Sequence, residues 1–186
     1  VATNTNDILY RALSNGDYST GTVTPTAAPS MDIQVSSNFE RLLFDVGGRD
    51  GIALAEQMRG FEASKAMQLT NAQRDGAAAL FTSMRADEDD MARAMRWACE
   101  DCAEIVDPHT AIGLHAARAV ELPHDVPVVT LATAHPAKFP DAVERSTGTR
   151  PSLPARVGDL FAREEAYTEL PGTYEAVRDH ILGHAA

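Results

Sequence analysis

The chain has 186 residues, of which 44% are hydrophobic and 23% are charged, and its formal net charge is −11. This composition is ordinary for a globular protein that is long enough to bury a core, and one domain is the default expectation. The acidic balance argues against nucleic acid or an anionic membrane as a partner, because both require clustered Lys and Arg. No apolar run approaches the ~20 residues of a membrane-spanning helix and no signal segment precedes the first motif, so we expect a cytoplasmic protein.

Strand ends and helix starts alternate along the chain, which favours an α/β fold. Residues 3–6 close a strand, and the apolar spacing of residues 7–14 predicts a helix that stops at Asn15-Gly16. The first residue, Val1, looks like part of a strand already under way, so we expect the natural N-terminus upstream. A polar loop follows over residues 16–29, typical of either a linker or a lid.

The middle of the chain is predominantly helical by its periodicity. Residues 31–44 open with a short strand-like stretch and continue as a helix that Ser37 or Asn38 can cap. Helices are then expected over 50–64 and 71–81, followed by a short extended segment over 81–85, and a further helix begins at Asp87.

Cysteine and histidine pairs in this sequence do not predict a metal or redox centre. Cys99 and Cys102 form a CxxC, but they lie within a periodic helical segment and no second CxxC completes a site. His180 and His184 are four residues apart without the glutamate of a HExxH motif. We therefore expect no metal.

Asp107-Pro108 predicts another helix start, with Asp107 as the N-cap and Pro108 in the first turn. His115 is expected to pack at the edge of the core. His109 and Thr110, near the helix N-terminus, can either pack structurally or face a ligand.

The segment 128–140, VVTLATAHPAKFP, contains the most specific signal. Val128, Val129 and Leu131 predict a strand buried on both faces, which would put Thr133 at the carboxyl end of a strand, where α/β sheets bind small ligands. Pro136 then predicts a helix over 136–147. Helices over 153–163 and 173–184 complete the expected order.

Four strings in this order resemble one family: ATNTNDIL (2–9), MDIQVSSNFERLLF (31–44), DPHTAIG (107–113) and ATAHPAKFP (132–140). They are similar to the C-terminal part of threonine synthase of the bacterial and fungal type, a fold type II pyridoxal-phosphate enzyme. The resemblance implies an α/β fold, in which residues 1–186 are the C-terminal part of the large cofactor-binding domain, with a mostly parallel sheet and flanking helices. It also implies the conversion of O-phospho-L-homoserine and water into L-threonine and phosphate.

The resemblance also suggests roles for individual residues. Thr133 matches the neutral hydroxyl that faces the pyridine nitrogen of pyridoxal 5'-phosphate. Asn4, Asn6, Asn38 and Arg41 are candidates for the substrate side, although capping or turn roles explain them as well. Arg41 and helix N-termini can favour a phosphate despite the net charge, because exposed charges are screened over about 8 Å.

One requirement of the family is missing from the sequence. The lysine that holds the cofactor covalently lies in a Phe-Lys-Asp context, and neither Lys65 nor Lys138 has it. We therefore expect a fragment that is inactive alone, with the N-terminal part of the same protein as its partner and with exposed sheet edges able to self-associate. The alternatives are another fold type II lyase, such as a dehydratase or β-replacement synthase, and a noncatalytic binding module.

Overall fold

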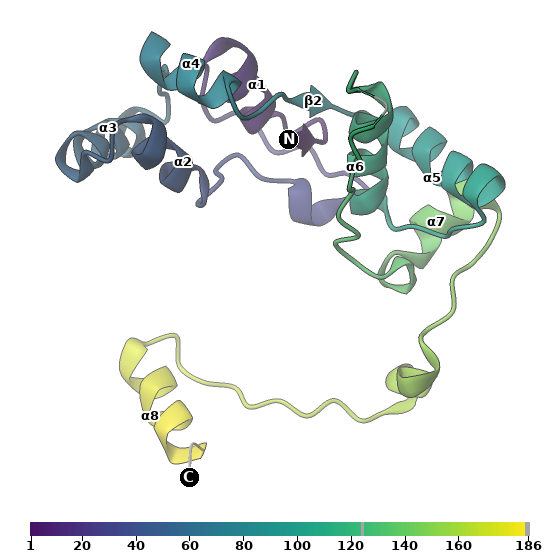
Figure 1. Cartoon of the computed structure of the whole chain (residues 1–186). Helices are drawn as coiled ribbons and strands as arrows, with labels where there is room; N and C mark the ends of the chain where they lie inside the picture. Colours follow the sequence, from purple (N-terminus) through teal and green to yellow (C-terminus); the bar gives the residue numbers. More distant parts are fainter. Residues whose placement is uncertain (124, 185–186) are drawn as a thin grey trace. The chain divides into compact units, whose positions relative to one another are not determined.

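A computed structural model describes residues 1–123 and 125–184. The chain divides into two compact units, 1–151 and 152–186. In the first unit, two groups of helices lie at opposite ends and a two-stranded sheet runs between them (Figure 1). Its first group comprises α1 (Ile8–Asn15), α2 (Phe39–Val46), α3 (Gly51–Ser64) and α4 (Asn71–Ala78). The second comprises α5 (Glu88–Cys102), α6 (Pro108–Ala119) and α7 (Pro140–Thr147), with 3₁₀ turns η1 (Pro29–Met31) and η2 (Pro136–Lys138).

The first group of helices packs around the aromatic ring of Tyr18, which is only 1% exposed. This ring stacks on Phe39 with a centroid distance of 4.8 Å and tilts against Phe61 at 5.0 Å. Ile8, Leu43, Met67 and Leu69 are buried in the same core. Tyr18 belongs to the polar loop expected over 16–29, so the loop contributes a central core residue as well as surface.

The second core lies between α5, α6 and α7, where Met91, Met95, Ile112 and Val143 are buried. Small residues, including Ala94 and Ala111, allow α5 and α6 to pack closely. The half-buried helix expected around the CxxC is therefore confirmed, with Cys102 exposed at its end.

Helix starts are the best-predicted features of the fold. Asp50 accepts hydrogen bonds from the backbone of Ile52 and Ala53, and Asp107 caps α6 as expected. Asp87 forms a capping box with Asp90 at the start of α5. The expected stop at Gly16 is also confirmed, since this glycine has a φ of 84° and a Cβ there would lie 2.5 Å from the side chain of Gln68.

The sheet is small and parallel. Strand β1 (Ala2–Thr3) pairs with β2 (Met84–Arg85), with Ala2 opposite Met84 and Thr3 opposite Arg85. Strand β1 contacts both α1 and α6, so it links the two helical groups. The α/β class is thus confirmed, with far more helix than sheet in the described residues, and the extended segment expected at 81–85 is present as β2.

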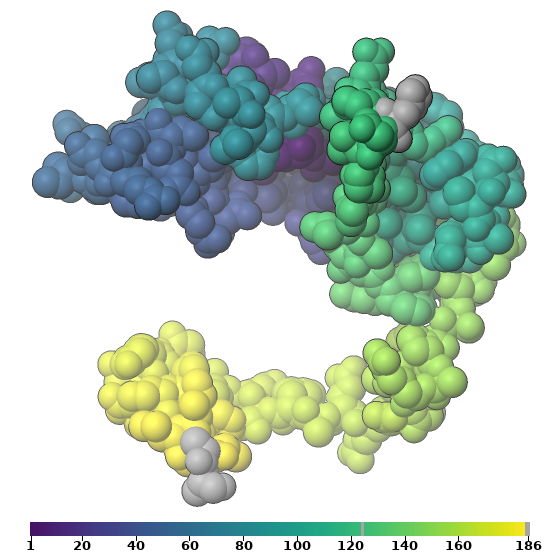
Figure 2. All heavy atoms as spheres, in the orientation of Figure 1, coloured from purple at the N-terminus to yellow at the C-terminus, as the bar shows by residue number. Residues whose placement is uncertain are grey.

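The strand expected over 128–131 is wrong for this structure. Val128, Val129 and Leu131 are 50%, 80% and 74% exposed and adopt no regular structure. A strand needs neighbours for its N–H and C=O groups, and in the part of the chain that is described the only named strands are β1 and β2, which pair with each other. In Figure 2 this part of the chain, drawn in green, lies at the surface of the first unit.

Several other boundaries also differ from expectation. The stretch 31–35 is not a strand, and α4 ends at Ala78 rather than near residue 81. The helix expected from Pro136 divides into η2 and α7, because Pro140 removes a backbone donor and restarts the helix.

The second unit contains two 3₁₀ turns, η3 (Ala155–Val157) and η4 (Leu160–Ala162), and the helix α8 (Tyr174–His184). The single helix expected over 153–163 is therefore wrong. Pro154 precedes η3 and Gly158 separates the two turns, so no continuous apolar face forms there. The expected C-terminal helix is confirmed.

Candidate functional site

The N-terminus of α6 is a centre of buried polar contacts around Asp107, whose side chain is fully buried. Its Oδ2 atom accepts from the backbone nitrogen of His109 at 3.0 Å and lies 2.7 Å from Nδ1 of the same residue. Its Oδ1 atom accepts from the backbone nitrogen of Thr110 at 3.1 Å and from the Thr110 hydroxyl. Four donors and the positive end of the helix together satisfy a buried carboxylate.

His109 joins α6 to two other segments. An ionised carboxylate can only accept, so Nδ1 of His109 carries the proton toward Asp107 and Nε2 is left as an acceptor. Nε2 accepts from the backbone nitrogen of Ser30 at 3.1 Å, and the Phe139 ring lies 4.7 Å from the imidazole. His109 is therefore a structural histidine that fixes η1 and the start of α7 against α6.

Thr110 fixes the position of Thr133. Its hydroxyl donates to Asp107, so its oxygen is free to accept from the backbone nitrogen of Thr133, 3.3 Å away. A second approach occurs three residues earlier, where a Cβ on Gly113 would lie 2.9 Å from Cγ2 of Thr130. The segment expected to be a strand is thus held along α6, and Thr133 is exposed in irregular structure rather than at a strand end.

Beyond Thr133, the chain turns at His135, whose Nδ1 accepts from the backbone nitrogen of Ala137 at 3.1 Å. Lys138 is exposed, and its ammonium lies 5.9 Å from the centroid of the Phe139 ring. Lys65, the other lysine, is exposed and ends α3 in a left-handed conformation. Both lysines therefore occupy surface positions.

Asn4 and Asn6 are buried and form a second polar network with Asp32. Asp32 Oδ1 accepts from Nδ2 of Asn4 at 2.7 Å and from Nδ2 of Asn6 at 3.0 Å. The same carboxylate accepts from the backbone nitrogen and the hydroxyl of Thr26. Asn6 also exchanges two 2.8 Å hydrogen bonds with the backbone of Thr24. These amides therefore hold the loop 16–29, which is the turn role allowed by the sequence.

The two polar networks meet at η1. Ser30, within this turn, is bound by His109, and Asp32, directly after it, is bound by Asn4 and Asn6. Hydrogen bonds thus link the end of β1 to η1 and η1 to His109. Asp107 then binds both His109 and Thr110, and Thr110 binds the Thr133 segment.

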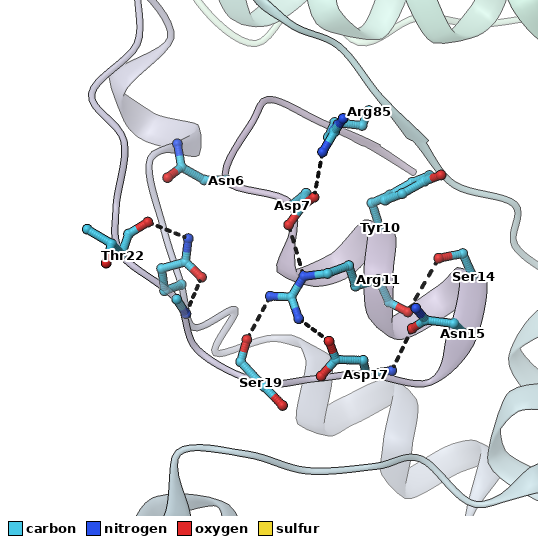
Figure 3. A network of polar contacts seen from close by, with 12 residues as sticks. Asn6, Asp7, Tyr10, Arg11, Ser14, Asn15, Asp17, Ser19, Thr22 and Arg85 are labelled. Carbon is cyan, nitrogen blue, oxygen red and sulfur yellow. Dashed lines mark hydrogen bonds and ion pairs between the residues drawn. The ribbon is translucent and has the colours of Figure 1, made fainter.

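Arg11 fixes the other end of the loop, as Figure 3 shows. Its Nε donates to Asp7 at 2.9 Å, its Nη2 donates to the carbonyl of Ser19 at 2.7 Å, and Nη1 pairs with Asp17. Arg85 of β2 pairs with the other oxygen of Asp7 at 3.0 Å. Hydrogen bonds from Ser19 and Arg11 hold the pKa of Asp17 below its ordinary value of 3.8, although partial burial opposes them.

Asn38 and Arg41 lie at the start of α2, and both are exposed. Asn38 precedes the helix but makes no side-chain capping bond; its Oδ1 instead accepts from the Ser36 hydroxyl at 2.6 Å. Within residues 1–123 and 125–184, no side-chain hydrogen bond joins Asn38 or Arg41 to the networks around Asp32 and Asp107. Hydrogen bonds in the described residues therefore do not join these two substrate-side candidates to the Thr133 segment.

A further contact between titratable side chains joins α6 to α5. His115, half-buried on α6, lies 3.7 Å from Asp90, and the backbone of Asp87 together with His115 and Arg93 holds the pKa of Asp90 below its usual value.

Among the described residues, no three His, Cys, Asp or Glu side chains gather closely enough to hold a metal ion. None of the described helices combines the length and hydropathy that crossing a bilayer requires.

Sequence reasoning missed Asp32 and Ser30, and it treated Asp107 only as a helix cap. The available signal was the DPHT string itself, because a His and a Thr in the first helical turn can both reach the carboxylate of the Asp that caps it. No local sequence pattern predicts that Asp32 accepts hydrogen bonds from Asn4 and Asn6, which lie 28 and 26 residues earlier.

Comparisons with known proteins assign the class and then the family. The fold is that of the fold type II pyridoxal-phosphate enzymes: PLP-bound threonine synthase from Brucella melitensis matches with a TM-score of 0.87 and 41% identity, over 98% of this chain and 39% of that chain. Threonine synthase from yeast matches with a TM-score of 0.81 and 31% identity, over 88% of this chain and 37% of that chain.

Residues 110–181 match the family model described as threonine synthase, C-terminal. Threonine synthase of Pseudomonas aeruginosa is 45% identical over 185 residues, which are 99% of this chain and 39% of that relative. This chain belongs to the threonine synthase family. It spans 39% of the length of this curated relative.

Proposed function

We propose that this chain is the C-terminal part of a pyridoxal-phosphate-dependent threonine synthase, which converts O-phospho-L-homoserine and water into L-threonine and phosphate. The observation that carries the proposal is the match to the PLP-bound enzyme, at 41% identity over 98% of this chain. A cytoplasmic location and a carbon–oxygen lyase acting on phosphates are part of the same proposal.

The residues present fit one side of a cofactor site. The Thr133 side chain is exposed, and its backbone N–H donates to Thr110 on α6. This hydrogen bond fixes the backbone that carries the neutral hydroxyl. Pyridoxal phosphate, when bound, supplies an electron sink for the negative charge that develops on the substrate. A hydroxyl at the ring nitrogen would not fix a full positive charge there, as a carboxylate would.

The substrate side of the proposal involves the four remaining candidates. Asn4 and Asn6 are fully engaged with Asp32 and Thr24, so they would shape this side by holding the loop 16–29. Arg41 is exposed at the start of α2, and a guanidinium there suits a phosphate. Asn38 would contribute an amide beside it.

The lysine that binds the cofactor would come from the remaining part of the longer protein. Lys65 and Lys138 lie in ASKAM and HPAKF, neither of which matches the Phe-Lys-Asp context. In this proposal residues 1–186 belong to the large cofactor-binding domain, the rest of the protein is the chain's partner, and the 186-residue chain is inactive by itself.

The test is an assay of the full-length protein with O-phospho-L-homoserine and pyridoxal phosphate. Threonine and phosphate should appear in equal amounts, whereas the 186-residue chain should release neither and show no protein-bound cofactor absorbance. Release of phosphate without threonine, or turnover by the chain alone, would overturn the proposal.

Replacement of Thr133 tests its assignment within the active protein. Thr133→Val should lower kcat by at least about tenfold while cofactor absorbance is retained, because the change removes only the hydroxyl. Thr130→Val is a matched control from the same segment, since valine preserves the methyl group beside Gly113. Equal turnover of the Thr133 and Thr130 variants would remove Thr133 from the site.

A further inference from the structure

We propose that Thr110 is a positioning residue that orients Thr133 toward the cofactor through a hydroxyl relay anchored on buried Asp107. This inference rests on the proposed function, because it assigns a supporting residue to the Thr133 site. It concerns one atom, the Oγ1 of Thr110, which is close both to a carboxylate and to a backbone amide.

The direction of the relay follows from the chemistry of its members. Asp107 is an acceptor only, so the Thr110 hydroxyl hydrogen must point to Oδ1 of Asp107. The lone pairs of the Thr110 oxygen are then directed away from the carboxylate, and one of them accepts from the Thr133 N–H at 3.3 Å. A donor contact to an anion polarises a hydroxyl and makes it a better acceptor, so the buried charge strengthens the bond that holds Thr133.

The anchor of the relay is rigid. Asp107 is 0% exposed, Thr110 is 5% exposed, and both lie in the first turn of α6 or directly before it. His109 immobilises the second carboxylate oxygen at 2.7 Å and is itself held by Ser30. A rotation of the Thr110 side chain would break its bond to Asp107, so the acceptor for Thr133 has one favoured position.

Thr133 depends on this contact more than a residue in a sheet would. Its segment has no ladder of backbone hydrogen bonds among the residues described by the structure, and its neighbours Leu131 and Ala132 are exposed. The hydrogen bond from the backbone N–H of Thr133 to Thr110 and the approach of Thr130 to Gly113 hold the segment near α6. Loss of the Thr110 acceptor would let the Thr133 backbone, and with it the hydroxyl, move.

The experiment measures hydrogen exchange and turnover in the full-length protein with pyridoxal phosphate bound. Thr110→Val keeps the shape of the side chain but removes the acceptor, so the Thr133 amide should exchange about fivefold faster, as expected for one lost hydrogen bond. Thr110→Ser keeps the hydroxyl and should restore slow exchange. Thr147→Val removes a hydroxyl that binds Val143 on α7 and should leave the Thr133 amide unchanged.

Turnover separates positioning from a general loss of structure. Thr110→Val should lower kcat about fivefold with little change in KM, retain the absorbance of the bound cofactor as Thr133→Val does, and be rescued by serine. In a double-mutant cycle, Thr110→Val should add nothing to Thr133→Val, because it acts through the same hydroxyl.

The outcomes distinguish the two proposals. A wild-type protein that makes no threonine overturns the proposed function, while exchange of the Thr133 amide still tests the relay. An active wild type in which Thr110→Val exchanges and turns over like Thr147→Val overturns the relay. Additive losses in the double variant would also overturn it.

Discussion

Two irregular segments of the first unit behave in opposite ways. The loop 16–29 is polar and lacks regular structure, yet it contributes buried Tyr18 and Ala28 and is fixed along most of its length. The segment 126–131 is apolar, yet Val129 is 80% exposed. Hydrophobicity alone would assign the first segment to the surface and the second to the core.

The difference lies in where each segment finds its hydrogen-bond partners. The loop binds side chains of its own chain: Arg11 at Ser19, Asn6 at Thr24 and Asp32 at Thr26. A buried strand instead requires the backbone of neighbouring strands. This chain spans 39% of the length of its Pseudomonas aeruginosa relative. Under the proposed function, the rest of the longer protein would supply such neighbours for residues 126–131.

The largest effect in this comparison is expected for Asp32→Ala, which should release the loop. The change leaves donors of Asn4, Asn6 and Thr26 without their acceptor, so the free energy of unfolding of the chain should fall by about 3 kcal/mol. Denaturant unfolding followed by circular dichroism measures this. Asp45→Ala is the control, because its pair with Arg49 is exposed and should be worth less than about 0.5 kcal/mol. Equal losses in the two variants would mean that Asp32 does not anchor the loop.

Acid should weaken the other anchor of the loop by a smaller amount. The pKa of Asp17 is held below 3.8 in the folded chain by Ser19 and Arg11, so its contribution is present above pH 3.8 and is lost as the pH falls through the lower folded value. Because the pair with Arg11 is partly exposed, this contribution should be below about 1 kcal/mol.

Unfolding measured between pH 5 and pH 2.5 tests this, with Asp17→Asn as the comparison. The variant should be less stable than wild type at pH 5, and the difference should shrink toward pH 2.5. A difference that is constant across this range would show that the ion pair does not carry the effect.

The smallest effect is expected in the apolar segment. Val129→Thr conserves shape at a side chain that is 80% exposed, so the stability of the 186-residue chain should change by less than about 0.5 kcal/mol. The same substitution in the full-length protein should cost more, because there we expect the segment to be covered. Sedimentation of the wild-type and Val129→Thr 186-residue chains would also show whether exposed apolar residues cause self-association. The variant should self-associate less than the wild type.

Much of the fold follows from short-range rules that act within a few residues. Asp50, Asp87 and Asp107 begin helices because each carboxylate accepts the unpaired N–H groups of the turn that follows it. Gly16 ends α1 because it adopts a positive φ without steric cost. These features could be predicted because cause and effect are neighbours in the chain.

The site could be predicted only in part. Thr133 stands out in the string ATAHPAKFP, and Asn4 and Asn6 stand out in ATNTND, but the chemistry of each depends on a distant partner. Thr110 binds Thr133 across 23 residues, and Asp32 binds Asn4 across 28. Such pairs have no local sequence pattern. Each one closes a long loop, and the entropy lost on closure is compensated by the packing of the whole unit rather than by neighbouring residues.

The sequence by itself determined the family, the helix starts at Asp50, Asp87 and Asp107, and the candidate residues of the site. Only the tertiary structure decided that Asp107 and Asp32 organise two linked networks, that the polar loop is anchored, and that residues 128–131 are not a strand here. The physical reason is that a cap satisfies its own helix, whereas a strand or a buried amide is satisfied only by whatever part of the protein lies beside it.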